Sequence, residues 1–69
     1  MFALYDEGAC AYVCKGGYVF RGEKYKVMGD QENAKKYKTK QAAENDKTRM
    51  IESQYVNIDY KTIAVEVEE

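Results

Sequence analysis

The chain contains no histidine, so it lacks the side chain that most often serves as a general base near neutral pH. Its single serine, Ser53, has no partner for a catalytic triad. Cys10 and Cys14 lack a basic activator, since Lys15 is adjacent in sequence but would point to the other face of a strand. Without histidine, only carboxylates remain to complete a metal site around the two cysteines. The glycine-containing segments do not match a phosphate-binding loop. We therefore predict a protein that is not an enzyme and that uses no metal or cofactor.

Proline is also absent, glycine occurs five times, and no apolar run approaches the roughly 20 residues of a membrane-spanning helix. The sequence therefore shows no linker and no membrane anchor. Its first residues lack the basic and long apolar segments of a signal peptide. With 69 residues, 45% of them apolar, the chain has material for one small core. We predict a single domain over residues 1–69, located in the cytoplasm.

Charge is nearly balanced, with a formal net value of −1, but it is unevenly distributed. Residues 31–49 contain six Lys/Arg and three Asp/Glu, whereas residues 50–69 contain one Lys and five Asp/Glu. The chain thus has a basic middle and an acidic tail. Nucleic-acid-binding proteins usually have a clear basic excess, which is missing here.

The N-terminal half alternates apolar and polar residues with the period of β-strands. We predict strands over residues 2–5, 9–15, 18–21 and 24–28. Gly16-Gly17 would form the two-residue loop of a hairpin, pairing Lys15 with Tyr18 and Cys14 with Val19. Gly22 would be either a bulge or a second tight turn.

The two cysteines belong to the second of these strands. At roughly 3.3 Å per residue, Cys10 and Cys14 would lie about 13 Å apart on one face of the strand. A disulfide needs Cα atoms within about 7 Å. We therefore predict no bridge and expect both side chains to be buried as apolar fillers on either side of Tyr12.

The middle of the chain has helix signals. Asp30 is expected to cap a short helical turn that runs to Ala34, and Thr39 to cap a main helix over residues 40–53. The apolar stripe of the main helix is thin, so this helix should cover one face of a sheet rather than lie deep in a core. We also expect an ion pair between Asp46 and Arg49.

Two further strands are predicted near the C-terminus, over residues 55–58 and 61–67. In the last strand, Ile63, Val65 and Val67 would face one way. The acidic end formed by Glu66, Glu68 and Glu69 would discourage edge-to-edge pairing. The predicted fold class is α+β: a small antiparallel sheet, a β-meander plus a C-terminal strand, with one main helix packed on one face.

A basic cluster marks the start of the main helix, and residues of the sheet can extend it. The candidate partner-binding residues are Arg21, Lys35, Lys36, Tyr37, Lys38 and Lys40. Lysines neutralise phosphates and tyrosines stack on bases, so this set can bind nucleic acid. The alternative is a solvated face with Tyr37 turned inward as a core anchor.

Seven tyrosines are more than a core of this size can bury. Exposed tyrosine is a favoured contact residue at protein interfaces because its area comes with little loss of entropy. The alternative is a set of half-buried rings whose hydroxyls reach water.

The segment from Ala34 to Glu44 resembles a pattern found in many small, mostly uncharacterised phage and prophage proteins. In that pattern a hairpin is followed by Ala-Lys-x-aromatic-x-Ser/Thr and by a helix that opens with Ala-Glu. The likeness covers residues 11–50, and the more polar residues 45–47 depart from it. The matching positions are Ala34, Lys35, Tyr37, Thr39, Ala43 and Glu44. The resemblance implies a small accessory protein, acting in the host cytoplasm, that binds and inhibits or modulates a host protein in counter-defence or host takeover.

Together these observations predict a non-enzymatic protein-binding module. One alternative is a small nucleic-acid-binding protein that uses the basic cluster of residues 35–40. Another is a subunit of an assembly whose final strand adds to a neighbour's sheet. A domain this small can also complete its core or sheet by self-association, so a homodimer is a further candidate state.

Overall fold

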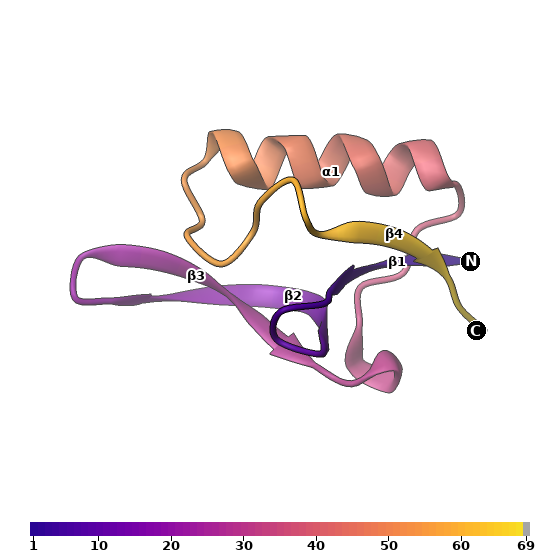
Figure 1. Cartoon of the computed structure of the whole chain (residues 1–69), viewed down its shortest axis with the longest axis horizontal. Helices are drawn as coiled ribbons and strands as arrows, with labels where there is room; N and C mark the ends of the chain where they lie inside the picture. Colours follow the sequence, from indigo (N-terminus) through magenta and orange to yellow (C-terminus); the bar gives the residue numbers. More distant parts are fainter. Residues whose placement is uncertain (69) are drawn as a thin grey trace.

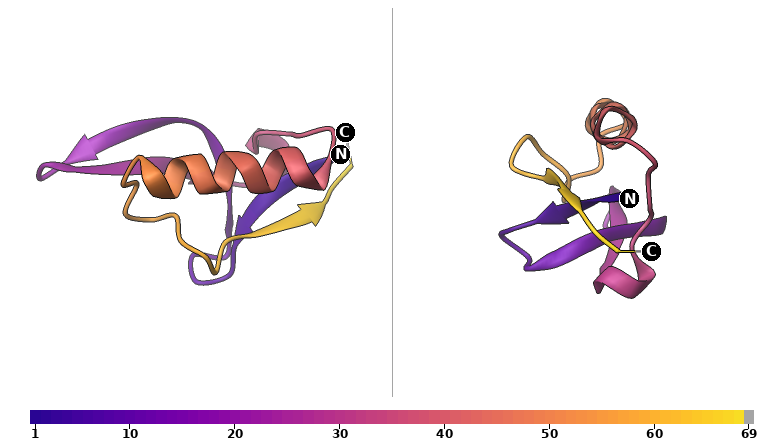
Figure 2. Two further views of the ribbon diagram at one scale, coloured as in Figure 1. Left: turned by 90° about the horizontal axis from the view of Figure 1, so that it is seen from above. Right: turned by 90° about the vertical axis from the view of Figure 1, so that its right-hand side faces the viewer.

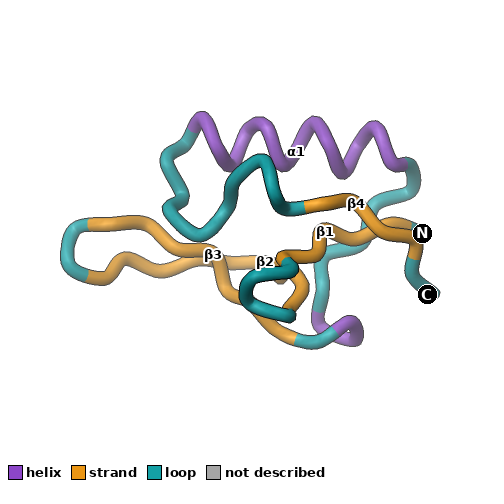
Figure 3. Tube along the Cα trace, viewed as in Figure 1, coloured by secondary structure: helices purple, strands orange, loops and turns teal. Residues whose placement is uncertain are grey.

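The structure, a computed structural model, describes residues 1–68. It confirms the predicted α+β class: a four-stranded antiparallel sheet in the order β3-β2-β1-β4, with one helix over β1 and β4 (Figure 1). The elements in chain order are β1 (Phe2–Asp6), β2 (Ala11–Phe20), β3 (Glu23–Gly29), the 3₁₀ turn η1 (Gln31–Asn33), α1 (Lys40–Glu52) and β4 (Ile63–Glu66). Loops connect the helix to β4 and β1 to β2 (Figure 3).

The hairpin of β2 and β3 turns at a different place from the one predicted. The turn is at Arg21-Gly22, where both residues have positive φ (53° and 80°). Positive φ at both central positions is the type I′ geometry, whose twist matches that of the flanking strands. Of the two alternatives for Gly22, the tight turn is therefore the one found.

The predicted loop at Gly16-Gly17 is wrong, and so is the register that followed from it. β2 runs through both glycines, and its outer half pairs Tyr18 with Tyr25. The register of β2 against β3 shifts between Val13 and Gly17, so the two glycines lie in a β-bulge. At Gly17 a Cβ would lie only 2.8 Å from the carbonyl oxygen of Tyr25. Close approach of another backbone group, and not chain reversal, explains this glycine.

The helix begins and ends almost where the sequence predicts. The Thr39 hydroxyl accepts a hydrogen bond from the amide of Ala42 at 3.1 Å, which satisfies one free donor of the first turn. Asp30 caps η1 in the same way through the amide of Asn33. The buried face of α1 is narrow and covers one side of the sheet, as expected. The helix contributes Ala43 and Met50 to the main core cluster between helix and sheet. The other members of this cluster are Leu4, Val13, Tyr37 and Ile58.

The larger apolar side chains of β4, Ile63 and Val65, point away from the helix. β1 pairs with β4 so that Ala3 lies opposite Val65 and Leu4 opposite Ala64. Since Leu4 belongs to the cluster under α1, its partner Ala64 faces the helix and Val65 faces the other side. Val67 joins a second small cluster there with Ala3 and Ala34. The sheet therefore has apolar side chains on both faces, although the helix covers only one.

The predicted strand over residues 55–58 is absent from the described part of the chain. Tyr55 makes only an isolated bridge with Lys24, and the segment crosses the edge of β3 as a loop. Asn57 replaces a strand partner there: its side-chain oxygen accepts from the Lys26 amide at 2.9 Å, and its NH₂ donates to the Lys26 carbonyl at 2.8 Å. A single side chain thus satisfies both backbone groups of Lys26, which a further strand would have paired.

The prediction that both cysteines are buried is half wrong. Cys14 is buried, and its backbone forms an isolated β-bridge with Ala34, but Cys10 is exposed. Cys10 lies in the turn before β2 with φ 53°, because β2 begins at Ala11 and not at residue 9. Both cysteines are free thiols in the structure.

Candidate functional site

The outer half of the β2–β3 hairpin projects beyond the rest of the molecule (Figures 1 and 2). We call residues 15–27 the arm. The molecule measures 35 × 21 × 19 Å along its principal axes, and the arm forms one end of the longest axis. Lys15 to Phe20 are all exposed, whereas Val13 and Cys14 at the base of the arm are buried. The arm is therefore the part of the sheet that the core does not cover.

One side of the arm carries an aromatic surface that faces solvent. Tyr18 pairs with Tyr25 and Phe20 with Glu23, so these four side chains share a face, and Val27 follows Tyr25 on it. We call this side the open face. Tyr18 and Phe20 are 53% and 55% exposed. The rings of Tyr18 and Tyr25 stack with centroids 5.4 Å apart and an interplanar angle of 12°. Isolated exposed apolar residues are ordinary, but a contiguous group on a projecting hairpin is typical of an interaction surface.

The opposite side of the arm is supported by the loop that follows the helix. The Tyr55 ring lies against Gly17, where a Cβ would come within 3.2 Å of the ring. The ammonium groups of Lys24 and Lys26 lie 5.6 and 5.5 Å from the centroid of that ring, within cation–π range. The two hydrogen bonds between the Asn57 side chain and the backbone of Lys26 hold the same loop in place. The open face is thus presented by a hairpin that is braced from behind.

The arm is basic although the chain is not. It carries Lys15, Arg21, Lys24 and Lys26 against one acidic residue, Glu23. The Glu23 carboxylate accepts a hydrogen bond from the Tyr25 hydroxyl at 3.3 Å. Burial, followed by the charge of Glu23, raises the pKa of that hydroxyl. Among the described residues the ion pairs are Lys35–Asp46 and Glu44–Lys47, so none of the four basic side chains of the arm is paired with a carboxylate.

The structure does not bring the sequence-predicted binding residues together. Arg21 lies at the tip of the arm, whereas the lysines of residues 35–40 precede and begin α1 at the other end of the long axis (Figures 1 and 2). The Lys36 ammonium donates to the carbonyls of Gln31 and Ala34. Lys38 and Lys40 are exposed. The predicted cluster is therefore divided into one arm residue, two exposed lysines and three side chains that bind within the chain.

Tyr37 is turned inward as a core anchor, which is the alternative to a nucleic-acid-binding role for this ring. It is 8% exposed, its ring belongs to the main core cluster, and its hydroxyl donates to the Asp46 carboxylate. Burial and this hydrogen bond raise the pKa of Tyr37 well above its usual range. Burial opposes ionisation of Asp46, but the hydrogen bonds from Tyr37 and Lys35 outweigh it and lower the pKa of that carboxyl. Lys35 pairs with Asp46 at 3.0 Å, so the predicted Asp46–Arg49 ion pair is replaced by one with the preceding loop.

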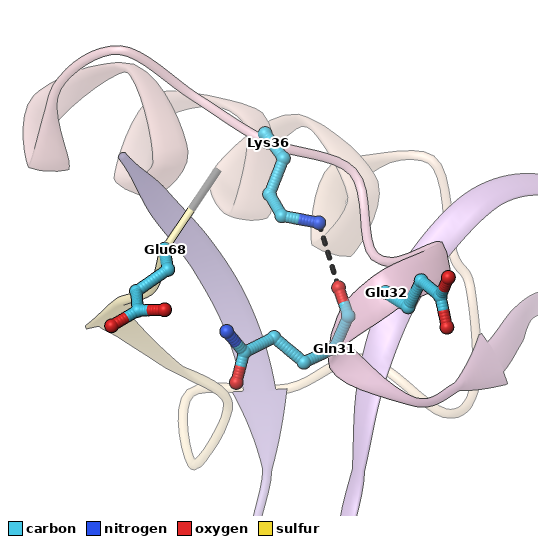
Figure 4. A pocket seen from close by; sticks show the side chains of 4 residues that line it. All are labelled: Gln31, Glu32, Lys36 and Glu68. Atoms are coloured by element: carbon cyan, nitrogen blue, oxygen red, sulfur yellow. Dashed lines mark hydrogen bonds between the residues drawn. The ribbon is translucent and has the colours of Figure 1, made fainter.

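A pocket of about 380 Å³ beside η1 is lined by Gln31, Glu32, Lys36 and Glu68 (Figure 4). The Lys36 ammonium points to the Gln31 carbonyl at 2.7 Å, so its charge is used to hold the turn. The remaining lining is exposed and polar, whereas small-molecule sites are mostly apolar and enclosed. This pocket is therefore a weaker candidate than the open face.

Sequence reasoning missed Tyr18, Val19 and Phe20 as candidate site residues. The misplaced loop at Gly16-Gly17 would have put them next to the turn of a short hairpin, with no reason to project. The useful signal was the excess of tyrosines, which required some rings to reach the surface. The order of aromatic, aliphatic and aromatic residues directly before the Arg21-Gly22 turn is a second signal.

Within residues 1–68, no helix has the length and apolar character needed to cross a membrane, and no group of three or more Cys, Asp or Glu side chains is placed to hold a metal ion. The chain matches no protein-family model, no curated protein and no solved structure. The arm and its chemistry are therefore the basis for the function proposed below.

Proposed function

We propose that this chain is a non-enzymatic protein-binding module whose contact surface is the open face of the arm. The observation that carries the proposal is the pair of half-exposed rings, Tyr18 and Phe20, on a hairpin that extends from the body of the molecule. Aromatic side chains supply most of the binding energy at protein interfaces because they combine large area with few rotatable bonds. A hairpin braced on its far side binds with a smaller loss of conformational entropy than a mobile loop.

The likeness of residues 34–44 to phage and prophage proteins supports an accessory role: binding and modulating a host protein in the cytoplasm. Such a role needs a contact surface and no catalytic group. The arm provides the surface with residues that the core does not require.

A matched pair of variants tests the proposal. Tyr18→Ser combined with Phe20→Ser removes both rings from the open face, and Tyr60→Ser removes an 80% exposed ring elsewhere. The tagged wild-type chain and both variants are incubated with host lysate, and the bound proteins are identified and then tested with purified components. We expect at least one purified partner to bind the wild type and the Tyr60 variant and to lose affinity for the double variant by about 100-fold or more. A partner that binds all three equally would refute the open face as the contact surface.

Nucleic-acid binding is the second candidate, and one observation favours it: Arg21, Lys24 and Lys26 lie on the same arm as the exposed rings. Base stacking, however, uses ring faces. Tyr18 and Tyr25 each give one face to the other, and the Arg21 guanidinium lies 5.2 Å from the centroid of the Phe20 ring. Fluorescence anisotropy with labelled single-stranded DNA and RNA at low salt tests this alternative. Tight binding that weakens steeply with salt would establish it.

A further inference from the structure

The charge of the arm opposes that of the rest of the molecule. Four basic residues and one acidic residue give the arm a formal charge of +3, so the remaining residues of a chain with net charge −1 carry −4. Glu32 of η1 and Glu68 after β4 line one pocket, which lies toward the other end of the long axis (Figure 1). A partner that approaches the molecule therefore meets a basic arm on an otherwise acidic protein.

Three of the four cations of the arm lie over aromatic rings. Arg21 packs over the Phe20 ring, and Lys24 and Lys26 pack over the Tyr55 ring. The guanidinium carbon of Arg21 lies 5.2 Å from the centroid of the Phe20 ring, a contact that uses no N–H hydrogen bond, and a guanidinium can donate two parallel N–H bonds to a carboxylate. A side chain that is ordered before binding loses less entropy when it pairs.

We propose that the partner presents an acidic surface that contacts the outer end of the arm. Its apolar side chains pack on Tyr18, Phe20 and Val27 of the open face. Its carboxylates pair with Arg21 at the tip and with Lys24, which lies on the opposite side of the exposed edge strand. The inference rests on the proposed function and adds the chemical class of the partner. Complementary charge of this kind accelerates association and rejects basic competitors, while the rings supply the affinity.

The other occupants fit the arm less well. A second copy docked arm to arm would bring two charges of +3 together, and like-charge contacts cost specificity and affinity. A nucleic acid has the required negative charge, but the valines of the arm, Val19 and Val27, are 70% and 40% exposed and have no ring on which a base can stack. The apolar part of the arm thus favours a protein as the source of the carboxylates.

The test uses the intact ¹⁵N-labelled chain and three probes of equal length in residues or nucleotides. The first is a synthetic peptide that alternates glutamate with leucine and phenylalanine, the second replaces each glutamate with lysine, and the third is single-stranded oligothymidine. Amide shifts in two-dimensional NMR spectra report where each probe binds. We expect the acidic peptide to shift arm amides in a saturable manner, with an affinity at least about tenfold higher than that of either other probe.

Charge-reversal variants provide the control. Arg21→Glu with Lys24→Glu should weaken binding of the acidic peptide by about tenfold or more and improve binding of the basic one. Lys38→Glu with Lys40→Glu makes the same change of charge on exposed residues outside the arm and should leave both affinities within about twofold. Both variants should keep the wild-type spectrum elsewhere, since all four side chains are exposed.

Each contrary result identifies a different error. Equal binding of the two peptides at the open face would overturn the acidic partner but keep a protein-binding arm. Tighter binding of oligothymidine would replace the protein with nucleic acid. Arm shifts that depend on protein concentration alone would indicate a second copy. Absence of arm shifts with the acidic peptide at millimolar concentration would also overturn the inference. Failure of the proposed function is recognised separately, by a lysate partner that binds the Tyr18→Ser, Phe20→Ser double variant as tightly as the wild type.

Discussion

The hydrogen bond from Tyr37 to Asp46 should make a measurable contribution to the stability of the fold. Tyr37→Phe removes only the hydroxyl and leaves the buried ring in the main core cluster. The variant therefore isolates one hydrogen bond between the segment that precedes α1 and the middle of the helix. It also leaves the Lys35–Asp46 ion pair available.

The magnitude follows from the charge and burial of the two groups. A hydrogen bond to a charged partner contributes about 1.5–3 kcal/mol. The Asp46 side chain is 18% exposed, so water and Lys35 compensate for part of the loss, and we expect about 1.5–2 kcal/mol. A domain of this size has a free energy of unfolding of roughly 3–10 kcal/mol, and each kcal/mol shifts Tm by about 4–8 °C. The variant should therefore melt roughly 6–16 °C below the wild type.

The pH dependence of this difference is a second prediction from the same contact. The pKa of Asp46 is lowered in the folded state, so its contribution to stability is complete above its unfolded pKa of about 3.9 and is lost as the pH falls through the folded value. The pKa of Tyr37 is raised, so its contribution is complete below about pH 10 and is lost as the pH rises further. The difference between wild type and variant should be constant from about pH 5 to 9 and smaller at pH 2–3.

Urea unfolding followed by circular dichroism at pH 7 and at pH 2.5 measures both effects. Tyr60→Phe is the matched control, because its ring is 80% exposed, and it should stay within about 0.5 kcal/mol of the wild type. The reasoning fails if Tyr37→Phe is as stable as the control at pH 7. It also fails if the destabilisation is the same at both pH values.

Three further substitutions test the fold, each by urea unfolding. Leu4→Ala empties a fully buried site and should cost about 2–5 kcal/mol, enough to unfold much of the population of so small a domain, and a cost under 1 kcal/mol would contradict the assigned core. Gly17→Ala should destabilise the fold by more than about 1 kcal/mol because its Cβ would meet a carbonyl oxygen at 2.8 Å. Gly8→Ala is the control and should be close to neutral, since its Cβ has an ordinary contact at 3.4 Å. Equal effects of the two substitutions would refute the close approach at Gly17. Thr39→Ala should cost about 1 kcal/mol and reduce helical signal, and an unchanged midpoint would show that the cap is not needed.

Local signals in the sequence predicted most of the elements, and contacts between distant residues decided the rest. Thr39 and Asp30 are capping residues whose bonds are made within three residues, so the sequence alone was enough. Gly16-Gly17 carries the same local signal as a hairpin turn. Gly17 is instead required because the Tyr25 carbonyl of the neighbouring strand and the Tyr55 ring, 38 residues along the chain, both approach it closely. The misplaced turn also hid the arm. The sequence therefore failed to indicate the candidate site because one turn was misplaced, although the aromatic and basic residues of the site are plain in the sequence.

The edges of the sheet indicate how the arm engages a partner. β3 is an edge strand in the order β3-β2-β1-β4, and an open edge would invite strand addition. Asn57 occupies the amide and carbonyl of Lys26, and the Val56 amide donates to the Lys24 carbonyl at 3.0 Å. These bonds block the middle of the edge, so a partner strand cannot extend the sheet on the arm side without first displacing the loop. Binding at the arm must then proceed through its side chains, so that charge and ring geometry, rather than backbone pairing, set the specificity.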